Sequence, residues 1–359
     1  MPHQPLLFDH RLHDETKISP QVAHQKTVNL ALQGVGSHGA FTWGVLDRLL
    51  EDERLSFDGI SATSAGAVNA VVLAYGLAAG GREQAKSALQ NYWRRLSEMT
   101  STGIFQPTVF DQMSGNFGLD LSPGFMFVDA LSHFFSPYEL NPLKYNPFKD
   151  LLDEVVDFEL LRRQKLIKLF LCATNVRSGK VKIFTGKEIS VDAVMASACL
   201  PTMFHAVEID GEAYWDGGYM GNPAIFPLIY GCESADIVIV HINPLFRAEV
   251  PHSADDILNR INEISFNSSL MREMRAVAFA TRLIDNGELD ATKHSRMLIH
   301  WIGNDPLMSQ LGTATQFHPE WSLLCRLRDE GRESAGKWLA QSFDEVGVRS
   351  TIDVADMFL

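Results

Sequence analysis

The chain has 359 residues, of which 46 % are hydrophobic and 21 % are charged. This composition is that of a globular protein, and the length suffices for one large domain with an extension or for two domains. The net charge of −13 argues against nucleic acid as a partner, because an acidic surface repels the phosphate backbone.

Cysteine spacing and the apolar runs indicate the compartment. The four cysteines lie far apart, with no spacing typical of a zinc site or a disulfide framework: Cys172, Cys199, Cys232 and Cys325. We therefore expect reduced thiols, no metal and a cytoplasmic protein. Residues 1–25 resemble a polar surface arm without a secretory signal, and no apolar run is long enough to cross a bilayer. Any membrane contact is expected to be peripheral, at the inner face.

The first predicted strand, residues 27–32, ends in a glycine-rich turn that precedes a helix. The turn reads G-x-G-x-x-G at Gly34, Gly36 and Gly39. One interpretation is a dinucleotide-binding turn, which needs an acidic residue at the end of the next strand. Asp58 is acidic, but it lies at the start of that strand. The other interpretation is an oxyanion hole, because glycines let backbone amides approach a carbonyl oxygen.

The second predicted strand runs into a sharp turn at Ser64, and a helix follows. Small residues flank the serine at Ala62, Ala65 and Gly66. A nucleophile elbow needs such neighbours, because the strand and the helix approach each other closely around the serine. The alternative is an ordinary strand–helix turn with a serine as the N-cap.

Strands and helices alternate from residue 27 to residue 246, which predicts an α/β fold with a mostly parallel sheet and helices on both faces. The segment 102–147 interrupts this pattern; it is irregular and rich in phenylalanine, as in a lid or an acyl-pocket wall, or in a loop packed on the core. The elements predicted after it are a helix near 148–158, strands at 166–175 and 180–184, a helix at 189–199, a hairpin around 210–211, a helix from 222–223 and a strand at 237–242. From residue 248 the pattern becomes mainly helical, with one apolar strand at 298–302 and a helical pattern over 321–346.

A serine nucleophile needs a base. Asp216 follows a strand, and Gly217 and Gly218 would let the backbone turn its carboxylate toward a neighbouring strand end. His205 precedes a strand and His241 lies within one, so neither occupies an obvious catalytic setting. A Ser–His mechanism remains the alternative.

Three separated motifs, in this order, resemble the patatin-like phospholipase family: the glycine turn at 34–39, the elbow at 62–66 and the segment 216–218. The run that leads into Asp216 is also similar. The resemblance covers roughly residues 27–246, and the helical remainder is similar to the extension of one bacterial branch. It implies a three-layer core and a Ser–Asp dyad that hydrolyses acyl esters of lipids through an acyl-enzyme, without a cofactor.

The resemblance also implies a role for each matching residue. Ser64 would be the nucleophile and Asp216 the base. The oxyanion loop would consist of Gly34, Val35, Gly36, Ser37, His38 and Gly39. Support for the elbow and the dyad would come from Ala62, Ala65, Gly66, Gly217 and Gly218.

The chain departs from the family pattern at three of these positions. Val35 stands where the family usually has glycine, His38 where it usually has arginine or lysine, and Ala62 where glycine is usual. A histidine at position 38 would bring a pH dependence that a fixed cation lacks. None of the three changes removes the nucleophile or its base.

Three functions follow from these observations. The leading one is a lipid acyl hydrolase, whose partner would be a phospholipid, a lysophospholipid, a storage polyester or another acyl ester. The second is a dinucleotide-dependent oxidoreductase that uses the glycine turn, and the third is a non-catalytic scaffold that binds a lipid or a protein partner. We expect an arm over 1–25, a core over 26–247 and a mainly helical extension over 248–359.

Overall fold

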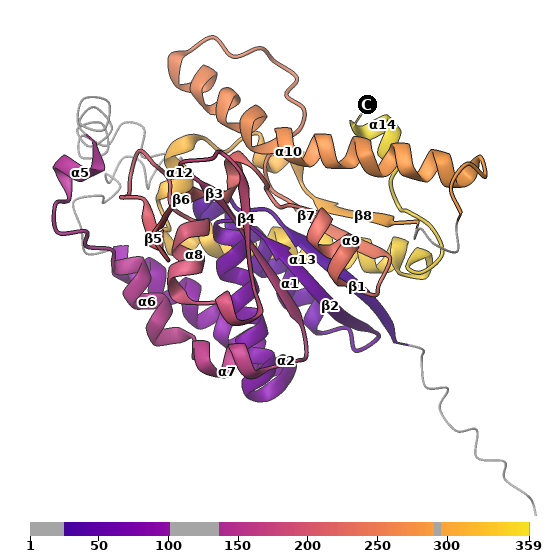
Figure 1. Cartoon of the computed structure of the whole chain (residues 1–359), viewed down its shortest axis with the longest axis horizontal. Helices are drawn as coiled ribbons and strands as arrows, with labels where there is room; N and C mark the ends of the chain where they lie inside the picture. The colour runs from indigo at the N-terminus through magenta and orange to yellow at the C-terminus, as the bar shows by residue number, and fades with distance from the viewer. Residues whose placement is uncertain (1–24, 101–135, 291–295, 359) are drawn as a thin grey trace, which may run out of the picture.

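The computed structural model describes residues 25–100, 136–290 and 296–358, and Figure 1 labels most of their helices and strands. One eight-stranded sheet has the order β5-β6-β3-β2-β1-β7-β8, and β4 also pairs with β3. The strands are β1 (Lys26–Leu32), β2 (Leu55–Ala62), β3 (Lys168–Asn175), β4 (Val181–Thr185), β5 (Val207–Ile209), β6 (Glu212–Asp216), β7 (Asp236–His241) and β8 (Leu298–Gly303).

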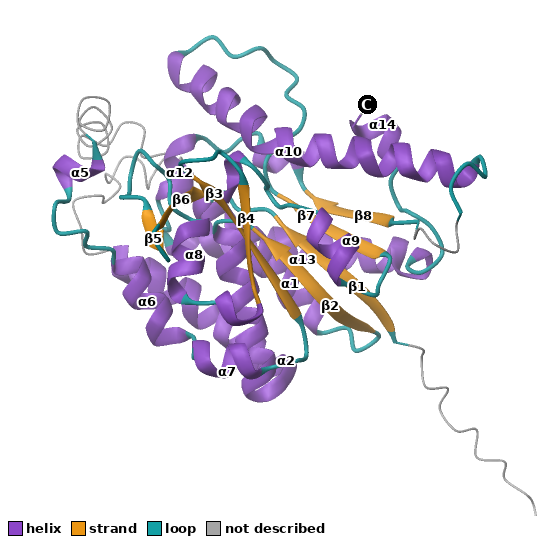
Figure 2. Cartoon of the chain, viewed as in Figure 1, coloured by secondary structure: helices purple, strands orange, loops and turns teal. Residues whose placement is uncertain are grey.

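Figure 2 shows this sheet crossing the molecule with helices on either side. The helices are α1 (Gly39–Leu50), α2 (Ala65–Thr100), α5 (Pro137–Leu140), α6 (Pro147–Val155), α7 (Phe158–Arg163), α8 (Val191–Ser197), α9 (Phe226–Gly231), α10 (Ala254–Asp285), α11 (Asp305–Met308), α12 (Thr313–Phe317), α13 (Trp321–Ser342) and α14 (Val354–Phe358). The pairs β1–β2, β2–β3, β1–β7 and β7–β8 are parallel, whereas β3 pairs antiparallel with β4 and β6. The predicted fold class is therefore confirmed.

The central strands divide their side chains between two cores, one on each face of the sheet. In β1, Leu30 and Leu32 belong to the first core and Ala31 belongs to the second. Helices α1, α2, α6, α7, α8 and α13 contribute to the first core, and α9, α10 and α14 to the second. The parallel strands are thus covered on both faces, which is why they are almost continuously apolar.

The helix that follows Ser64 is bent at Gly80 and Gly81, whose backbone angles are not helical. Gly81 has a φ of +78°, which favours glycine. The sequence predicts one helix directly after Ser64 and another over 82–99, and these two helices are confirmed as the two arms of α2.

Two helix boundaries differ from the predicted ones. The helix expected over 148–158 is two helices, α6 and α7, because the carboxylate of Asp157 accepts hydrogen bonds from two amides of the next turn and starts a new helix there. The helix expected from 222–223 begins only at Phe226. Asn222 instead makes hydrogen bonds to the glycine turn, as described below.

Two predicted segments fall largely outside the described residues. The polar arm is described only at Gln25. The lid or pocket wall expected over 102–147 is described only from residue 136 onward, where it contains the short helix α5 and the start of α6.

The residues after 248 are mainly helical, as predicted, but they also complete the sheet. Strand β8 pairs in parallel with β7 along its whole length. Helix α13 packs against α1, and its Leu323, Leu324 and Leu327 are buried in the first core. The described part of the predicted extension therefore shares a core with residues 26–247, and the domain boundaries themselves stay a prediction.

Candidate active site

Ser64 occupies the tight turn between β2 and α2. Its φ of +56° lies in the left-handed region, which is uncommon for any residue except glycine. The Ser64 amide donates a hydrogen bond of 3.0 Å to Oγ of Ser197 in α8. A side chain at Gly66 would collide with the carbonyl oxygen of Leu32 in β1. The close approach of β1 to the elbow therefore requires glycine at position 66.

The sheet register brings Asp216 to the level of Ser64. Ala62 of β2 pairs with Leu171 of β3. Two residues further along β3, Ala173 pairs with Asp216 of β6. Ser64 lies two residues beyond Ala62, so it reaches the same level of the sheet as Ala173 and Asp216. The Ser64 hydroxyl lies close enough to the Asp216 carboxylate to lower the pKa of that group.

The Asp216 carboxylate is completely buried. Burial raises its pKa to about 7, while hydrogen bonds from the Gly218 amide and the Ser64 hydroxyl oppose the shift. The Gly218 amide donates to Oδ1 at 2.7 Å. No group in the described parts of the chain makes a hydrogen bond of regular geometry to Oδ2. The carboxylate is thus suited to take up a proton near neutral pH.

Close packing against the elbow explains two of the three glycines in the predicted oxyanion loop. A Cβ atom at Gly34 would overlap the carbonyl oxygen of Thr63, and one at Gly39 would lie 2.7 Å from Cβ of Ala65. The Gly34 amide also donates a hydrogen bond of 3.1 Å to Oδ1 of Asn222. The glycine turn therefore fits against the nucleophile turn itself.

The third glycine, Gly36, has a φ of +48° and begins the 3-10 helix η1 (Gly36–His38). Gly36 and Ser37 line the same cavity as Ser64. Their backbone amides donate no hydrogen bond to another residue that the structure describes, as expected for the first turn of a helix. Two free amides beside a serine hydroxyl could stabilise an oxyanion.

His38 does not behave as the sequence suggested. Its side chain is buried, and burial lowers its pKa to about 3. The imidazole is therefore neutral at physiological pH, and the expected pH dependence from this residue is wrong for the neutral range. Its Nε2 lies 2.7 Å from Oγ1 of Thr315 in α12.

The cavity at Ser64 has a volume of about 180 Å³. Its wall is mostly apolar or aromatic and includes Tyr92, Trp93, Phe148, Met195 and Phe204. None of the described residues that line it carries a charge. The cavity is therefore suited to a hydrocarbon chain rather than to a charged group.

The alternative bases lie elsewhere. The Nε2 atom of His205 is 3.1 Å from the carbonyl oxygen of Pro137, and Nδ1 of His241 is 3.3 Å from Asp305. Neither histidine is among the described residues that line the cavity. The structure thus brings Asp216, and neither of these histidines, to the serine.

Asp58 is the acidic residue that a dinucleotide site would need near the glycine turn, but its carboxylate binds other groups. Its carboxylate lies 3.0 Å from Nζ of Lys168 and accepts hydrogen bonds from the amides of Glu233 and Ser234. Asp58 lies four residues before the end of β2. This placement disfavours the dinucleotide interpretation of the turn.

Asn222 contacts the candidate site but was not predicted from the sequence. Its Oδ1 accepts the Gly34 amide, its carbonyl oxygen accepts Nε2 of Gln33 at 3.0 Å, and its amide lies 3.3 Å from Oγ of Ser269 in α10. Asn222 therefore joins the glycine turn, the segment after Asp216 and α10. An asparagine six residues after the predicted base, followed by proline, was the available signal.

An α/β sheet that presents a serine at a strained strand–helix turn, beside free backbone amides, has the arrangement of a serine hydrolase. A sequence model of the patatin-like phospholipase family matches residues 30–229. The chain therefore belongs to the patatin-like phospholipase family.

Two similar solved structures share less than a fifth of their aligned residues with this chain. VipD from Legionella pneumophila is 16 % identical over 89 % of this chain and 67 % of that chain, with a TM-score of 0.42. A chain of the heterodimeric ExoU–SpcU complex from the type III secretion system of Pseudomonas aeruginosa is 17 % identical, with a TM-score of 0.34. That match covers 68 % of this chain and 51 % of the other chain. No curated protein matches the chain significantly in sequence.

The described residues contain no cluster of three or more histidine, cysteine or acidic side chains that could hold a metal ion. Among the same residues, no helix combines the length and the apolar character needed to span a bilayer. All four cysteines are free thiols.

Proposed function

We propose that this protein hydrolyses carboxylic esters of lipids with Ser64 as the nucleophile and Asp216 as the base. The observation that carries the proposal is the placement of a strained serine beside a buried carboxylate whose pKa is raised to about 7. Membership of the patatin-like phospholipase family supports the broader class, a lipid acyl hydrolase.

In the first half of the reaction, Ser64 Oγ attacks the ester carbonyl carbon and its proton passes to Asp216. The amides of Gly36 and Ser37 stabilise the negative charge on the carbonyl oxygen. The tetrahedral intermediate collapses, the C–O bond to the alcohol breaks, and the alcohol takes the proton from Asp216. Ser64 is left as an acyl ester.

In the second half, Asp216 takes a proton from water, and the hydroxide attacks the acyl-enzyme. Collapse of the second intermediate breaks the bond to Ser64, which recovers its proton, and a carboxylic acid leaves. No cofactor takes part in either half.

The apolar lining of the cavity supports a substrate whose acyl chain enters the protein. The alcohol part of the substrate would remain outside this cavity, whether the substrate is a phospholipid, a lysophospholipid or a polyester. Four free thiols support a reducing compartment such as the cytoplasm, where the chain would reach its substrate as a peripheral protein at a membrane surface.

The test compares the wild type with Ser64→Ala, Asp216→Asn and the double variant on a panel of acyl esters. Each single variant should lose at least ~10³-fold in kcat/KM, and the double variant should be little worse, because the two residues act as one unit. A fluorophosphonate probe should label the wild type at Ser64 and should not label Ser64→Ala.

Three outcomes would contradict the proposal. A wild type that hydrolyses no ester and resists the probe would favour a binding scaffold. Dinucleotide binding weakened by substitution of the loop glycines would favour the oxidoreductase. An active Asp216→Asn variant, with activity lost on substitution of His205 or His241, would replace the dyad by a Ser–His mechanism.

A further inference from the structure

Part of the wall of the Ser64 cavity comes from outside the segment that matches the family. Gln316, Phe317 and Pro319 line the cavity together with Ser64. These residues lie some ninety positions beyond the end of the family match at residue 229. We call residues 309–319, which include α12, the wall segment.

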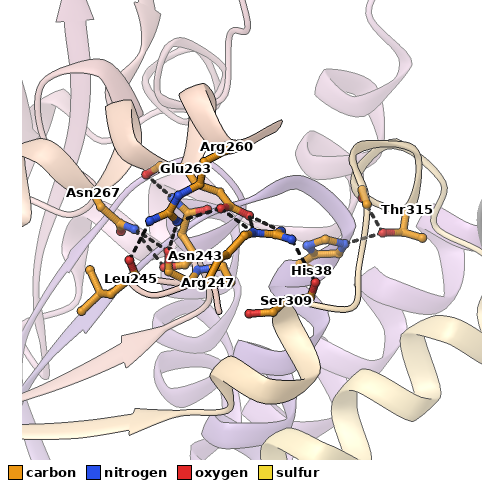
Figure 3. Close-up of polar contacts among 11 residues, drawn as sticks. His38, Asn243, Leu245, Arg247, Arg260, Glu263, Asn267, Ser309 and Thr315 are labelled. Atoms are coloured by element: carbon orange, nitrogen blue, oxygen red, sulfur yellow. Dashed lines mark hydrogen bonds and ion pairs between the residues drawn. The ribbon is translucent and has the colours of Figure 1, made fainter. Parts of the chain in front are cut away.

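The wall segment is fastened to the predicted oxyanion loop by one buried hydrogen bond. Oγ1 of Thr315 lies 2.7 Å from Nε2 of His38 and donates at 2.7 Å to the carbonyl oxygen of Gly312. Because the hydroxyl has a single proton and uses it on Gly312, His38 must donate to Thr315 from a protonated Nε2. The low pKa of His38 agrees with this neutral tautomer. Figure 3 shows His38 and Thr315 facing each other.

A second attachment holds the start of the wall segment. Arg247 donates a hydrogen bond of 3.1 Å to the carbonyl oxygen of Ser309. The same guanidinium pairs with Glu263 of α10, whose side chain is buried and also binds Arg260 at 3.0 Å. Figure 3 shows this network on one side of His38 and Thr315 on the other. The wall segment is thus fixed at both of these points.

The backbone of the wall segment also touches the site directly. A Cβ atom at Gly36 would collide with the carbonyl oxygen of Gln316. The next residue, Phe317, has 38 % of its surface exposed while its side chain lines the cavity, so it lies where the cavity meets solvent.

We propose that the wall segment sets the acyl-chain preference of the enzyme, with Phe317 as the specificity-determining side chain and the His38–Thr315 hydrogen bond as the device that positions it. This inference rests on the proposed ester hydrolysis at Ser64. A cavity whose described lining residues carry no charge distinguishes substrates by size and shape, so a bulky ring at its edge limits the chains that it accepts.

The first experiment measures kcat/KM for p-nitrophenyl esters of butanoate and dodecanoate. Phe317→Ala should raise the dodecanoate-to-butanoate ratio by about tenfold or more, because several methylene groups gain access to space that the ring occupies. Phe279→Ala is the matched control, since Phe279 is an exposed phenylalanine of α10 that does not line this cavity. It should leave the ratio unchanged.

The second experiment tests the hydrogen bond. Thr315→Val keeps the shape of the side chain but loses the hydroxyl, and it should shift the ratio in the same direction as Phe317→Ala. Thr315→Ser keeps the hydroxyl and should retain the wild-type ratio. In the Phe317→Ala background, Thr315→Val should add little, because both changes act through the same ring. Unfolding midpoints identify any variant that fails to fold.

The outcomes separate the two proposals. If the wild type hydrolyses esters but folded Phe317→Ala keeps the wild-type ratio, the role of the wall segment is overturned and the hydrolase proposal stands. If Thr315→Val and Thr315→Ser behave alike, the positioning role of His38 is overturned. A wild type inert toward every ester overturns the proposed function and this inference with it.

Discussion

In the proposed mechanism, Asp216 is under opposite demands in catalysis and in folding. As the proposed base it must be ionised, yet it is completely buried, and burial favours its neutral form. Its carboxyl group titrates near 3.8 in the unfolded chain and at about 7 in the folded protein. Between these pH values the folded state binds more protons than the unfolded state, so the contribution of Asp216 to stability is lost as the pH rises from about 4 to about 7.

Asp216→Asn should therefore stabilise the protein at alkaline pH. A shift of about three pKa units corresponds to about 4 kcal/mol, which the wild type loses above pH 7 and the uncharged amide does not. Urea unfolding at pH 4 and pH 8 measures the difference. The free energy of unfolding of the variant, relative to that of the wild type, should be higher at pH 8 than at pH 4. The same relative value at both pH values would show that Asp216 is not buried as a charge.

The activity of the wild type should have the opposite pH dependence. Its kcat/KM should rise with pH and level off above about 7, as Asp216 becomes ionised. His38 contributes no step to this profile in the neutral range, because its pKa is about 3. The most active form of the enzyme is therefore also the form that carries the buried charge.

The sequence could single out Ser64 and Asp216 as candidates because each lies in a short local motif with small neighbours. It could not indicate Asn222 or Thr315 in the same way. Their roles depend on contacts with Gly34 and His38, which are 188 and 277 positions away along the chain. The burial that neutralises His38 is likewise a product of tertiary packing, and no local pattern at residue 38 reveals it.

The glycine turn is the element on which the proposed oxyanion hole depends. Gly36→Ala would place a Cβ atom at a φ of +48° and against the carbonyl oxygen of Gln316. We expect kcat to fall by about 10²-fold or more, the loss typical of one displaced oxyanion donor. Single-turnover kinetics with a p-nitrophenyl ester measures the acylation step directly.

Gly186→Ala is the matched control for this change. Gly186 has a similar φ of +55°, but a Cβ atom there would meet no atom of the described residues within 4 Å. Both variants should lose about 1 kcal/mol of stability from the left-handed backbone, and Gly36→Ala should lose more because its Cβ atom also collides with Gln316. Only Gly36→Ala should slow the reaction. Equal rates in the two variants would remove Gly36 from the proposed hole.

Most elements could be predicted from periodicity and turn residues, and the exceptions have local physical causes. The split between α6 and α7 depends on Asp157, which caps a helix in the middle of a region with helical spacing. The late start of α9 reflects hydrogen bonds that use Asn222 in the turn before the helix. In both places a polar side chain overrides the hydrophobic pattern.

For the whole molecule, the sequence could not show how the C-terminal residues join the core. An apolar run at 298–302 predicts a strand but not its partner, and β8 pairs with β7 some sixty residues earlier. The helical pattern of α13 likewise does not indicate that α1 is its neighbour. Contacts between distant parts of a chain follow from the topology of the sheet, which local patterns do not specify.

Helices α1 and α13 meet through two glycines, and this crossing provides a test of how closely the C-terminal residues belong to the core. A Cβ atom at Gly331 of α13 would overlap the carbonyl oxygen of Phe41 and lie 3.0 Å from the amide of Val45. At Gly44 of α1 it would overlap the carbonyl oxygen of Arg328. The two backbones therefore approach too closely for any side chain larger than hydrogen.

Gly331→Ala should destabilise the protein by about 1–3 kcal/mol, because the helices must separate to admit a methyl group. Gly336→Ala, five positions further along the same helix, should raise stability by up to about 1 kcal/mol. Within the described residues its Cβ atom would meet only Arg48 Nε, at 3.9 Å, and alanine favours a helix. Urea unfolding of both variants measures the contrast within one helix. If Gly331→Ala were as stable as Gly336→Ala, α13 could move away from α1 at no cost, and the C-terminal residues would form a separable extension.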